Sequence, residues 1–83
     1  MYFAYVIYSK EFNRYYKGHC HNIDVRLKEH NAGRTSSTKP FIPWEVIYYE
    51  PFETLENAVK REKYFKTAAG RRYLKKILPA LTL

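Results

Sequence analysis

The spacing of hydrophobic and polar positions along the chain predicts three β-strands. Residues 2–8, YFAYVIY, are aromatic and β-branched without alternation, which is typical of a strand buried on both faces. The polar residues 9–13, SKEFN, predict a turn, and residues 14–19, RYYKGH, predict a second strand that completes a hairpin. Residues 44–50, WEVIYYE, again combine aromatic and β-branched side chains and predict a third strand.

The segment between the second and third predicted strands contains a helix and a loop. Asn22 is a good N-cap residue, so we expect a helix from Ile23 to about Asn31. Gly33 follows the last helical residues, where a glycine commonly ends a helix. Residues 34–43, RTSSTKPFIP, are rich in hydroxyl groups and cations and contain two prolines, which predicts a loop.

Two further helices are predicted in the C-terminal part of the chain. Residues 51–66, PFETLENAVKREKYFK, have helical periodicity, and Glu53 or Thr54 can begin this helix. A break near residues 68–70 leads to a last helix with one apolar and one basic face, its apolar positions being Tyr73, Leu74, Ile77 and Leu78. The order β-β-α-β-α-α predicts an α/β fold in which helices flank a small central three-stranded antiparallel sheet, within a single domain of residues 1–83.

Glu62 occupies an unexpected position in the second predicted helix. At about 100° per residue it falls near the middle of an apolar stripe, which consists of Leu55, Ala58, Val59, Phe65 and Ala69. A carboxylate among apolar neighbours is costly unless a cation or hydrogen bonds compensate it. Glu62 therefore needs a partner, and a metal ion bound beside a nucleic acid is one candidate.

The first predicted helix also carries polar residues on its core-facing stripe. Ile23, Arg26, Leu27 and His30 share one face by their spacing, and an arginine and a histidine are unusual there. In a structural interpretation, Arg26 forms a buried ion pair with Glu62, and His30 is hydrogen-bonded nearby. In a functional interpretation these side chains belong to a site. Helix spacing alone favours neither.

The composition of the chain narrows the choice of partner and compartment. A formal net charge of +7 and a pI near 9.6 favour a polyanion, most often a nucleic acid. The single cysteine, Cys20, excludes a disulfide framework, and with His19 and His21 alone it cannot complete a tetrahedral zinc site. The sequence contains neither a visible signal peptide nor a stretch long enough to span a bilayer, so we expect a cytoplasmic protein without membrane contact.

Short motifs follow one another at regular spacings along nearly the whole chain. Phe3-Ala4-Tyr5 and Tyr16-Lys17-Gly18 lie in the first two predicted strands, and Arg26 and His30 follow in the first helix. The remaining motifs are Ser37-Thr38-Lys39, Pro43-Trp44 and the segment AVKREKYFK that contains Glu62. Together they resemble the GIY-YIG nuclease domain, especially its small stand-alone bacterial members, which are similar to the N-terminal nuclease module of the bacterial excision-repair nuclease.

The match departs from the family pattern at a few positions. Phe3 and Ala4 replace the first glycine and the middle residue of the first motif, and Lys17 replaces the aliphatic residue of the second. His19 stands where some relatives carry a lysine beside the active site. The first two motifs vary between subfamilies, so these departures do not indicate a loss of activity.

The resemblance implies a DNA endonuclease that depends on Mg²⁺ or Mn²⁺ and acts in DNA repair or processing. It implies that Glu62 holds the metal and that Arg26 contacts the phosphoryl oxygens, since a guanidinium is planar and always charged. Tyr5 or Tyr16 would position or deprotonate the attacking water, helped by His19 or His30 because histidine titrates near neutral pH. The expected catalytic set is Tyr5, Tyr16, His19, Arg26, His30 and Glu62, and the expected phosphate contacts are Lys17, Arg34, Lys39, Arg71 and Arg72.

Two alternatives to a nuclease stay open at this stage. One is a nucleic-acid-binding module that has the same fold but little activity. The other is an interaction protein in which Arg26, His30 and Glu62 form a buried polar network. A nuclease would use a separate targeting protein or have low specificity, and we expect Tyr5, Tyr16, Arg26 and Glu62 to converge on one surface.

Overall fold

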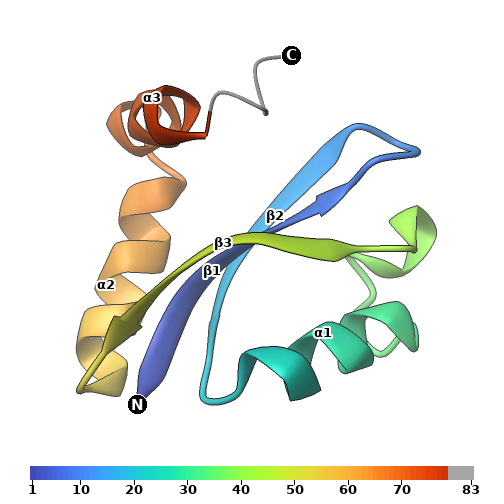
Figure 1. Ribbon diagram of the computed structural model, residues 1–83, viewed down its shortest axis with the longest axis horizontal. Coiled ribbons are helices and arrows are strands. Elements are labelled where there is room, and N and C mark those ends of the chain that lie inside the picture. Colours follow the sequence, from blue (N-terminus) through green and yellow to red (C-terminus); the bar gives the residue numbers. More distant parts are fainter. Residues whose placement is uncertain (79–83) are drawn as a thin grey trace.

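The structure, a computed structural model, describes residues 1–78 and contains one antiparallel sheet. Its strands are β1 (Tyr2–Ser9), β2 (Arg14–Cys20) and β3 (Glu45–Phe52), in the order β2-β1-β3. The central strand β1 is thus the first in the chain, and the edge strand β2 returns beside it through a short turn (Figure 1). In this turn Asn13 has a φ of 51°, a left-handed conformation that asparagine tolerates better than most residues.

The register of the hairpin assigns alternate residues of β2 to opposite faces of the sheet. Tyr5 pairs with Gly18, and Val6 pairs with Lys17. Because side chains alternate along a strand, Tyr16 and Gly18 share one face with Tyr5. Lys17 and His19 then share the opposite face with Val6.

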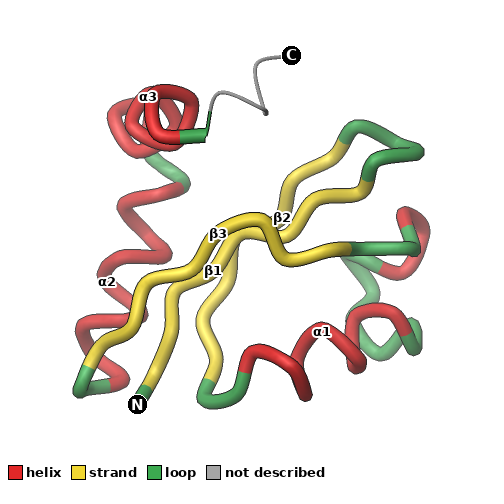
Figure 2. Tube along the Cα trace, viewed as in Figure 1, coloured by secondary structure: helices red, strands yellow, loops and turns green. Residues whose placement is uncertain are grey.

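Three helices cover the two faces of the sheet (Figures 1 and 2). They are α1 (Ile23–Asn31), α2 (Leu55–Phe65) and α3 (Ala68–Ile77), and a short 3-10 helix spans Lys39–Phe41. The first face packs against α1 and the loop after it, around the buried cluster Tyr5, Ile7, Cys20 and Trp44. The second face packs against α2 and α3, around the buried cluster Ala4, Val6, Phe65 and Leu74.

The observed order β-β-α-β-α-α and the antiparallel three-stranded sheet confirm the predicted fold class. The side chain of Asn22 caps α1 by accepting a hydrogen bond from the Val25 amide at 3.1 Å, as expected. Thr54 caps α2 in the same way, which decides between the two predicted starting residues. Gly33 follows α1 with a φ of 77°, the left-handed conformation that ends many helices.

Two predicted boundaries are wrong. The third strand does not end at residue 50, because Pro51 and Phe52 pair with β1 and extend β3. The break before the last helix falls at Lys66–Thr67, and Gly70 lies inside α3. The glycine is required there by packing, since a Cβ atom on Gly70 would lie 1.8 Å from the carbonyl oxygen of Tyr64.

The predicted apolar stripe of the second helix is narrower than expected. Ala58 and Phe65 are buried, but Leu55 is 48% exposed and Ala69 is an exposed residue of α3.

Among residues 1–78 no helix combines the length and the hydropathy that a bilayer crossing requires. The predicted domain end at residue 83 lies outside the described residues.

Candidate active site

A buried chain of hydrogen bonds connects β1, α1 and the loop that follows α1. The Tyr5 hydroxyl lies 2.8 Å from Nε2 of His30, and Nδ1 of His30 lies 2.8 Å from Oγ1 of Thr38. The three residues are 3%, 1% and 0% exposed, respectively. We call this arrangement the Tyr5–His30–Thr38 chain.

Burial sets the protonation of this chain. It raises the pKa of Tyr5 well above the ordinary value of tyrosine, so the phenol keeps its proton. Burial, together with the positive charge of Arg26, lowers the pKa of His30. At neutral pH the imidazole is therefore uncharged and can accept a proton on one nitrogen.

Gly18 leaves the space that the Tyr5 ring occupies. A Cβ atom at position 18 would lie 2.6 Å from the Tyr5 hydroxyl oxygen and 2.7 Å from Cζ of the same ring. A larger residue would therefore push the hydroxyl away from His30. The Tyr16 ring lies on the same face, with its centroid 5.2 Å from that of His30. The second motif therefore ends in glycine because a side chain at position 18 would collide with the Tyr5 ring.

Arg26 lies at the rim of this face and not in a buried ion pair with Glu62. Its guanidinium is 3.3 Å from Glu29, one helical turn away, and its side chain is 41% exposed. The structural interpretation that paired Arg26 with Glu62 is therefore wrong. The positive charge of Arg26 nevertheless acts on both residues: it opposes part of the rise that burial causes in the pKa of Tyr5, and it adds to the lowering that burial causes in the pKa of His30.

Glu62 has two hydrogen-bonding partners that lie on the second face of the sheet, His19 and Lys66. Oε1 accepts a hydrogen bond from His19 Nδ1 at 2.5 Å, and Oε2 accepts one from Lys66 Nζ at 2.6 Å. The carboxylate side chain is only 15% exposed. Burial alone would raise the pKa of Glu62, but Lys66 and His19 hold it below its ordinary value. Glu62 is thus an ionised acid at neutral pH.

The two groups of side chains meet at the edge strand β2. Tyr16 and Gly18 face α1, whereas His19 faces α2 and contacts Glu62. The negative charge of Glu62 and the positive charge of Arg26 both influence the pKa of Tyr5, which places all three within electrostatic range. The site therefore extends around the edge of β2, whereas the sequence had led us to expect it on one face of the sheet.

The donor set at Glu62 suits a hard divalent cation that keeps most of its water. Within residues 1–78 no group of three or more His, Cys, Asp or Glu side chains is arranged to hold a metal. Mg²⁺ is commonly bound by one or two carboxylates with water and phosphate as the other ligands, so Glu62 alone can serve. Lys66 would have to release its oxygen, and its side chain is 52% exposed, which leaves it room to turn away.

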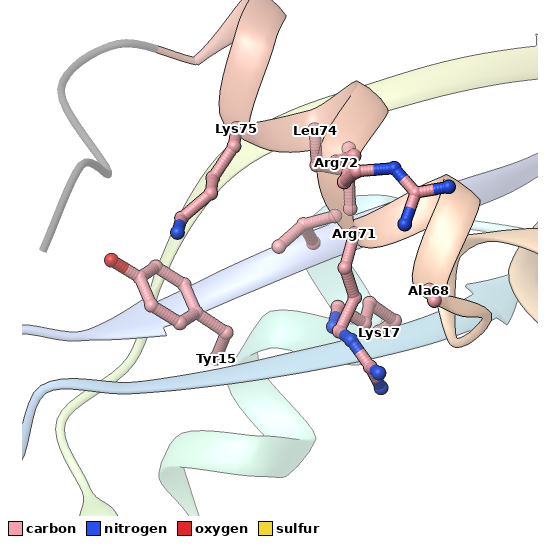
Figure 3. Close-up of a pocket in the computed structure, with 8 residues that line it drawn as sticks. Tyr15, Lys17, Ala68, Arg71, Arg72, Leu74 and Lys75 are labelled. Atoms are coloured by element: carbon pink, nitrogen blue, oxygen red, sulfur yellow. The ribbon is translucent and has the colours of Figure 1, made fainter.

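The expected phosphate contacts divide into two groups. Lys17, Arg71 and Arg72 line a groove of about 430 Å³ between β2 and α3, and Lys75 adds a fourth cation (Figure 3). None of the described lining residues is acidic. Burial and the charges of Arg71 and Lys66 lower the pKa of Lys17. Arg34 and Lys39 do not line this groove and belong to the loop after α1.

Three residues of these networks had not been predicted. Lys66 lies four residues after Glu62 and Lys75 four residues after Arg71, so helical spacing could have identified both. Thr38 lies in a loop without periodicity. Its hydroxyl group indicates that Thr38 can form a hydrogen bond, but the sequence does not indicate that the partner is His30.

Comparison with known proteins identifies the family to which the chain belongs. The family model described as "GIY-YIG catalytic domain" matches residues 1–75. The chain therefore belongs to the GIY-YIG family, which confirms the resemblance seen in its motifs.

The relatives are small proteins of similar length. UPF0213 protein SH2523 of Staphylococcus haemolyticus is 33% identical over 76 residues, which are 90% of this chain and 92% of the relative. UPF0213 protein lwe0147 of Listeria welshimeri is 43% identical over 65 residues, 77% of this chain and 71% of the relative. UPF0213 protein YazA of Bacillus subtilis is 38% identical over 65 residues, 77% and 65% of the two chains. No solved structure matches the chain significantly.

Proposed function

We propose that the protein is a metal-dependent endonuclease that hydrolyses phosphodiester bonds of DNA. The supporting observation is that ionised Glu62, the exposed Arg26 guanidinium and the Tyr5–His30–Thr38 chain surround the same short stretch of β2 in a GIY-YIG domain. This combination offers a carboxylate for a metal, a cation for the phosphoryl group and a neutral proton acceptor. We infer a cytoplasmic role in DNA repair or processing with a separate targeting partner, by analogy with excision-repair nucleases.

In this proposal Arg26 binds the scissile phosphoryl group. Its half-exposed guanidinium can exchange Glu29 for two phosphoryl oxygens, because an exposed ion pair at 3.3 Å is weak. Bound Mg²⁺ or Mn²⁺ on Glu62 would supply positive charge for the developing negative charge at phosphorus and the leaving oxygen.

The two tyrosines have different parts in the proposal. The Tyr5 proton is engaged with His30, so Tyr5 is the less suitable contact for the attacking water. Tyr16 is half-buried, and among residues 1–78 its hydroxyl has no hydrogen-bond partner. We therefore assign water positioning to Tyr16. His19 would hold the Glu62 carboxylate in place through its 2.5 Å hydrogen bond.

The groove between β2 and α3 provides a path for the nucleic-acid backbone. Lys17 follows Tyr16 in β2 but points to the opposite face, where Arg71 lies beside it and Arg72 and Lys75 line the same groove (Figure 3). A strand that passes around the edge of β2 would therefore contact these cations before it reaches Arg26. Arg34 and Lys39 would contact the strand on the other side of the sheet.

Substitution of the proposed metal ligand tests the nuclease. Purified protein is incubated with labelled single-stranded, duplex, flapped and branched DNA, with Mg²⁺, Mn²⁺ or EDTA. Glu62→Gln should nearly abolish metal-dependent cleavage and leave binding and folding close to unchanged, since Arg26 does not depend on Glu62. Glu56→Gln, in the same helix but 76% exposed, is the matched control and should retain activity. Equal cleavage by the parent protein and Glu62→Gln would refute the proposal.

A nucleic-acid-binding module with little activity is the second candidate. The observation in its favour is that both carboxylate oxygens of Glu62 already accept hydrogen bonds, from His19 and Lys66. A module of this kind would bind DNA without cutting any substrate of the panel. In that case Lys66→Ala should not confer activity with Mn²⁺, whereas an enzyme in which Lys66 competes with the metal should become active at lower Mn²⁺.

A further inference from the structure

The Tyr5–His30–Thr38 chain ends at a group that can only accept hydrogen bonds. The Thr38 hydroxyl lies 3.3 Å from the main-chain carbonyl oxygen of Thr35. A carbonyl has no proton, so the Thr38 hydroxyl must donate to it. Its oxygen then faces His30 as an acceptor at 2.8 Å.

The donor and acceptor roles at Thr38 determine those of the other two hydrogen-bonding residues, His30 and Tyr5. Because Thr38 accepts, Nδ1 of His30 must carry the ring proton, and in a neutral ring Nε2 then has a lone pair. The Tyr5 hydroxyl, 2.8 Å away, must donate to Nε2. The Tyr5 oxygen then keeps lone pairs that can accept a further hydrogen bond.

The loop is built to hold Thr38 in this position. The Thr38 amide donates to the Thr35 carbonyl at 3.1 Å, and the Thr38 carbonyl accepts a hydrogen bond from Trp44 Nε1 at 2.8 Å. Asn31, the last residue of α1, bonds to both the amide and the carbonyl of Trp44. The hydroxyl that faces His30 is thus held in place both by the turn that contains Thr38 and by Trp44, which immediately precedes β3.

We propose that Thr38 is a positioning residue that fixes His30 as its Nδ1–H tautomer, so that Nε2 stays the acceptor for the Tyr5 proton. The inference rests on the proposed function only for its effect on catalysis. The tautomer itself is a property of the folded protein, independent of any substrate. In this arrangement the Tyr5 oxygen can accept a hydrogen bond from another group in the site while the Tyr5 hydroxyl donates its own hydrogen bond to Nε2 of His30.

Nitrogen-15 NMR of the imidazoles tests the tautomer directly. In the parent protein near pH 7.5, Nδ1 of His30 should have the shift of a protonated nitrogen and Nε2 that of an unprotonated one. His19→Gln and His21→Gln variants assign the three histidines of the chain. A His30 ring in the Nε2–H form, or one that is fully protonated, would overturn the inference even if the protein cleaves DNA.

Substitution of Thr38 tests the cause. Thr38→Val keeps the shape but removes the acceptor, so the His30 ring should shift toward a mixture of tautomers, and the cleavage rate should fall by about tenfold or more. Thr38→Ser keeps the hydroxyl, so it should retain both the Nδ1–H tautomer of His30 and the cleavage rate of the parent protein. Thr35→Val is the matched control, because only the main-chain carbonyl of Thr35 is used, and it should leave both unchanged.

The outcomes separate the two proposals. A parent protein that cuts no substrate but shows the Nδ1–H form refutes the proposed function and leaves the tautomer assignment standing. An active Thr38→Val protein with an unchanged His30 ring refutes the role of Thr38. If Thr38→Val does not fold, the parent spectrum and Thr38→Ser still decide.

Discussion

At the scale of single residues, Glu50 and Arg61 show how a charge is kept inside this small protein. Arg61 of α2 donates from Nε to Glu50 of β3 at 2.8 Å, and from a terminal nitrogen to the second oxygen at 3.3 Å. Tyr48 donates to the same carboxylate. The Arg61 guanidinium also lies 5.0 Å from the Tyr73 ring centroid, so the pair joins β3, α2 and α3.

This ion pair should make the fold sensitive to acid. Burial alone would raise the pKa of Glu50, but hydrogen bonds from Arg61 and Tyr48 hold it below its ordinary value of 4.5. A depressed pKa contributes stability that is complete above about pH 4.5 and is lost as the pH falls through the value in the folded state. Urea unfolding across this range should therefore show a falling free energy of unfolding in the parent protein.

The variant Glu50→Gln should flatten that pH dependence. We expect it to lower the free energy of unfolding by about 2 kcal/mol at neutral pH, because Arg61 loses its counter-charge in a partly buried site. Glu56→Gln removes a carboxylate from a pair that is exposed on both sides and should leave the curve nearly unchanged. Parallel curves for Glu50→Gln and the parent protein would contradict this account.

At the scale of elements, α2 and α3 meet at a glycine that leaves no room for a side chain. Thr67 caps α3 by accepting a hydrogen bond from the Gly70 amide at 3.0 Å. This brings Gly70 against the end of α2, where no side chain fits beside the Tyr64 carbonyl. Phe65 and Leu74, one from each helix, then pack in the same buried cluster.

Gly70→Ala should separate the two helices. The new methyl group would overlap main-chain atoms 1.8 Å away, which cannot move independently of α2. We expect the free energy of unfolding to fall by about 3 kcal/mol or more, measured by urea denaturation. Ala69→Gly, at the exposed neighbouring position, should cost only about 1 kcal/mol through helix propensity. A Gly70→Ala protein as stable as Ala69→Gly would show that α3 can shift without cost.

Element types could be predicted from the sequence better than element boundaries. Asn22 and Thr54 gave usable helix starts because a side-chain cap is a local interaction. The end of β3 could not be found in this way, because Pro51 and Phe52 are held by pairing with residues 2 and 3 at the other end of the chain. Tertiary pairing outweighed the helical pattern of that segment.

The same distinction between local patterns and tertiary pairing applies to the residues of the candidate site. Glu62 was conspicuous because an acid on an apolar stripe conflicts with helix periodicity. Its bond to His19 spans 43 positions of sequence and depends on the register of β2 against β1, which no local pattern encodes. The fixed position of Thr38 likewise depends on the contact between Trp44 and Asn31.

At the scale of the whole molecule, the positive charge is unevenly distributed. The net charge of +7 includes a cluster at the groove between β2 and α3, formed by Lys17, Arg71, Arg72 and Lys75. Exposed lysines elsewhere, such as Lys28 and Lys60, stand on the outer surfaces of α1 and α2. The local density of positive charge, more than the net charge of the whole protein, should decide where a polyanion binds.

The salt dependence of DNA binding should reveal this distribution. Each lost phosphate contact lowers the slope of log affinity against log salt concentration by about 0.9 for duplex and about 0.7 for single strands. Arg71→Ala combined with Arg72→Ala should therefore reduce the slope by roughly 1.4 to 1.8, measured by fluorescence anisotropy. Lys28→Ala with Lys60→Ala removes the same charge from other surfaces and should change the slope far less. Equal slopes for the two double variants would show that the groove is not the binding path.

The position of β1 in the centre of the sheet also determines when the fold can form during synthesis. β1 is the first of the described strands to leave the ribosome, and the hairpin with β2 is complete after residue 20. The other edge of β1 has no partner until β3 emerges at residues 45–52, which begins 25 positions after the end of β2. During that interval the nascent hairpin presents an unpaired, largely apolar strand, so rapid formation of α1 over one face would be its first protection against association with other chains.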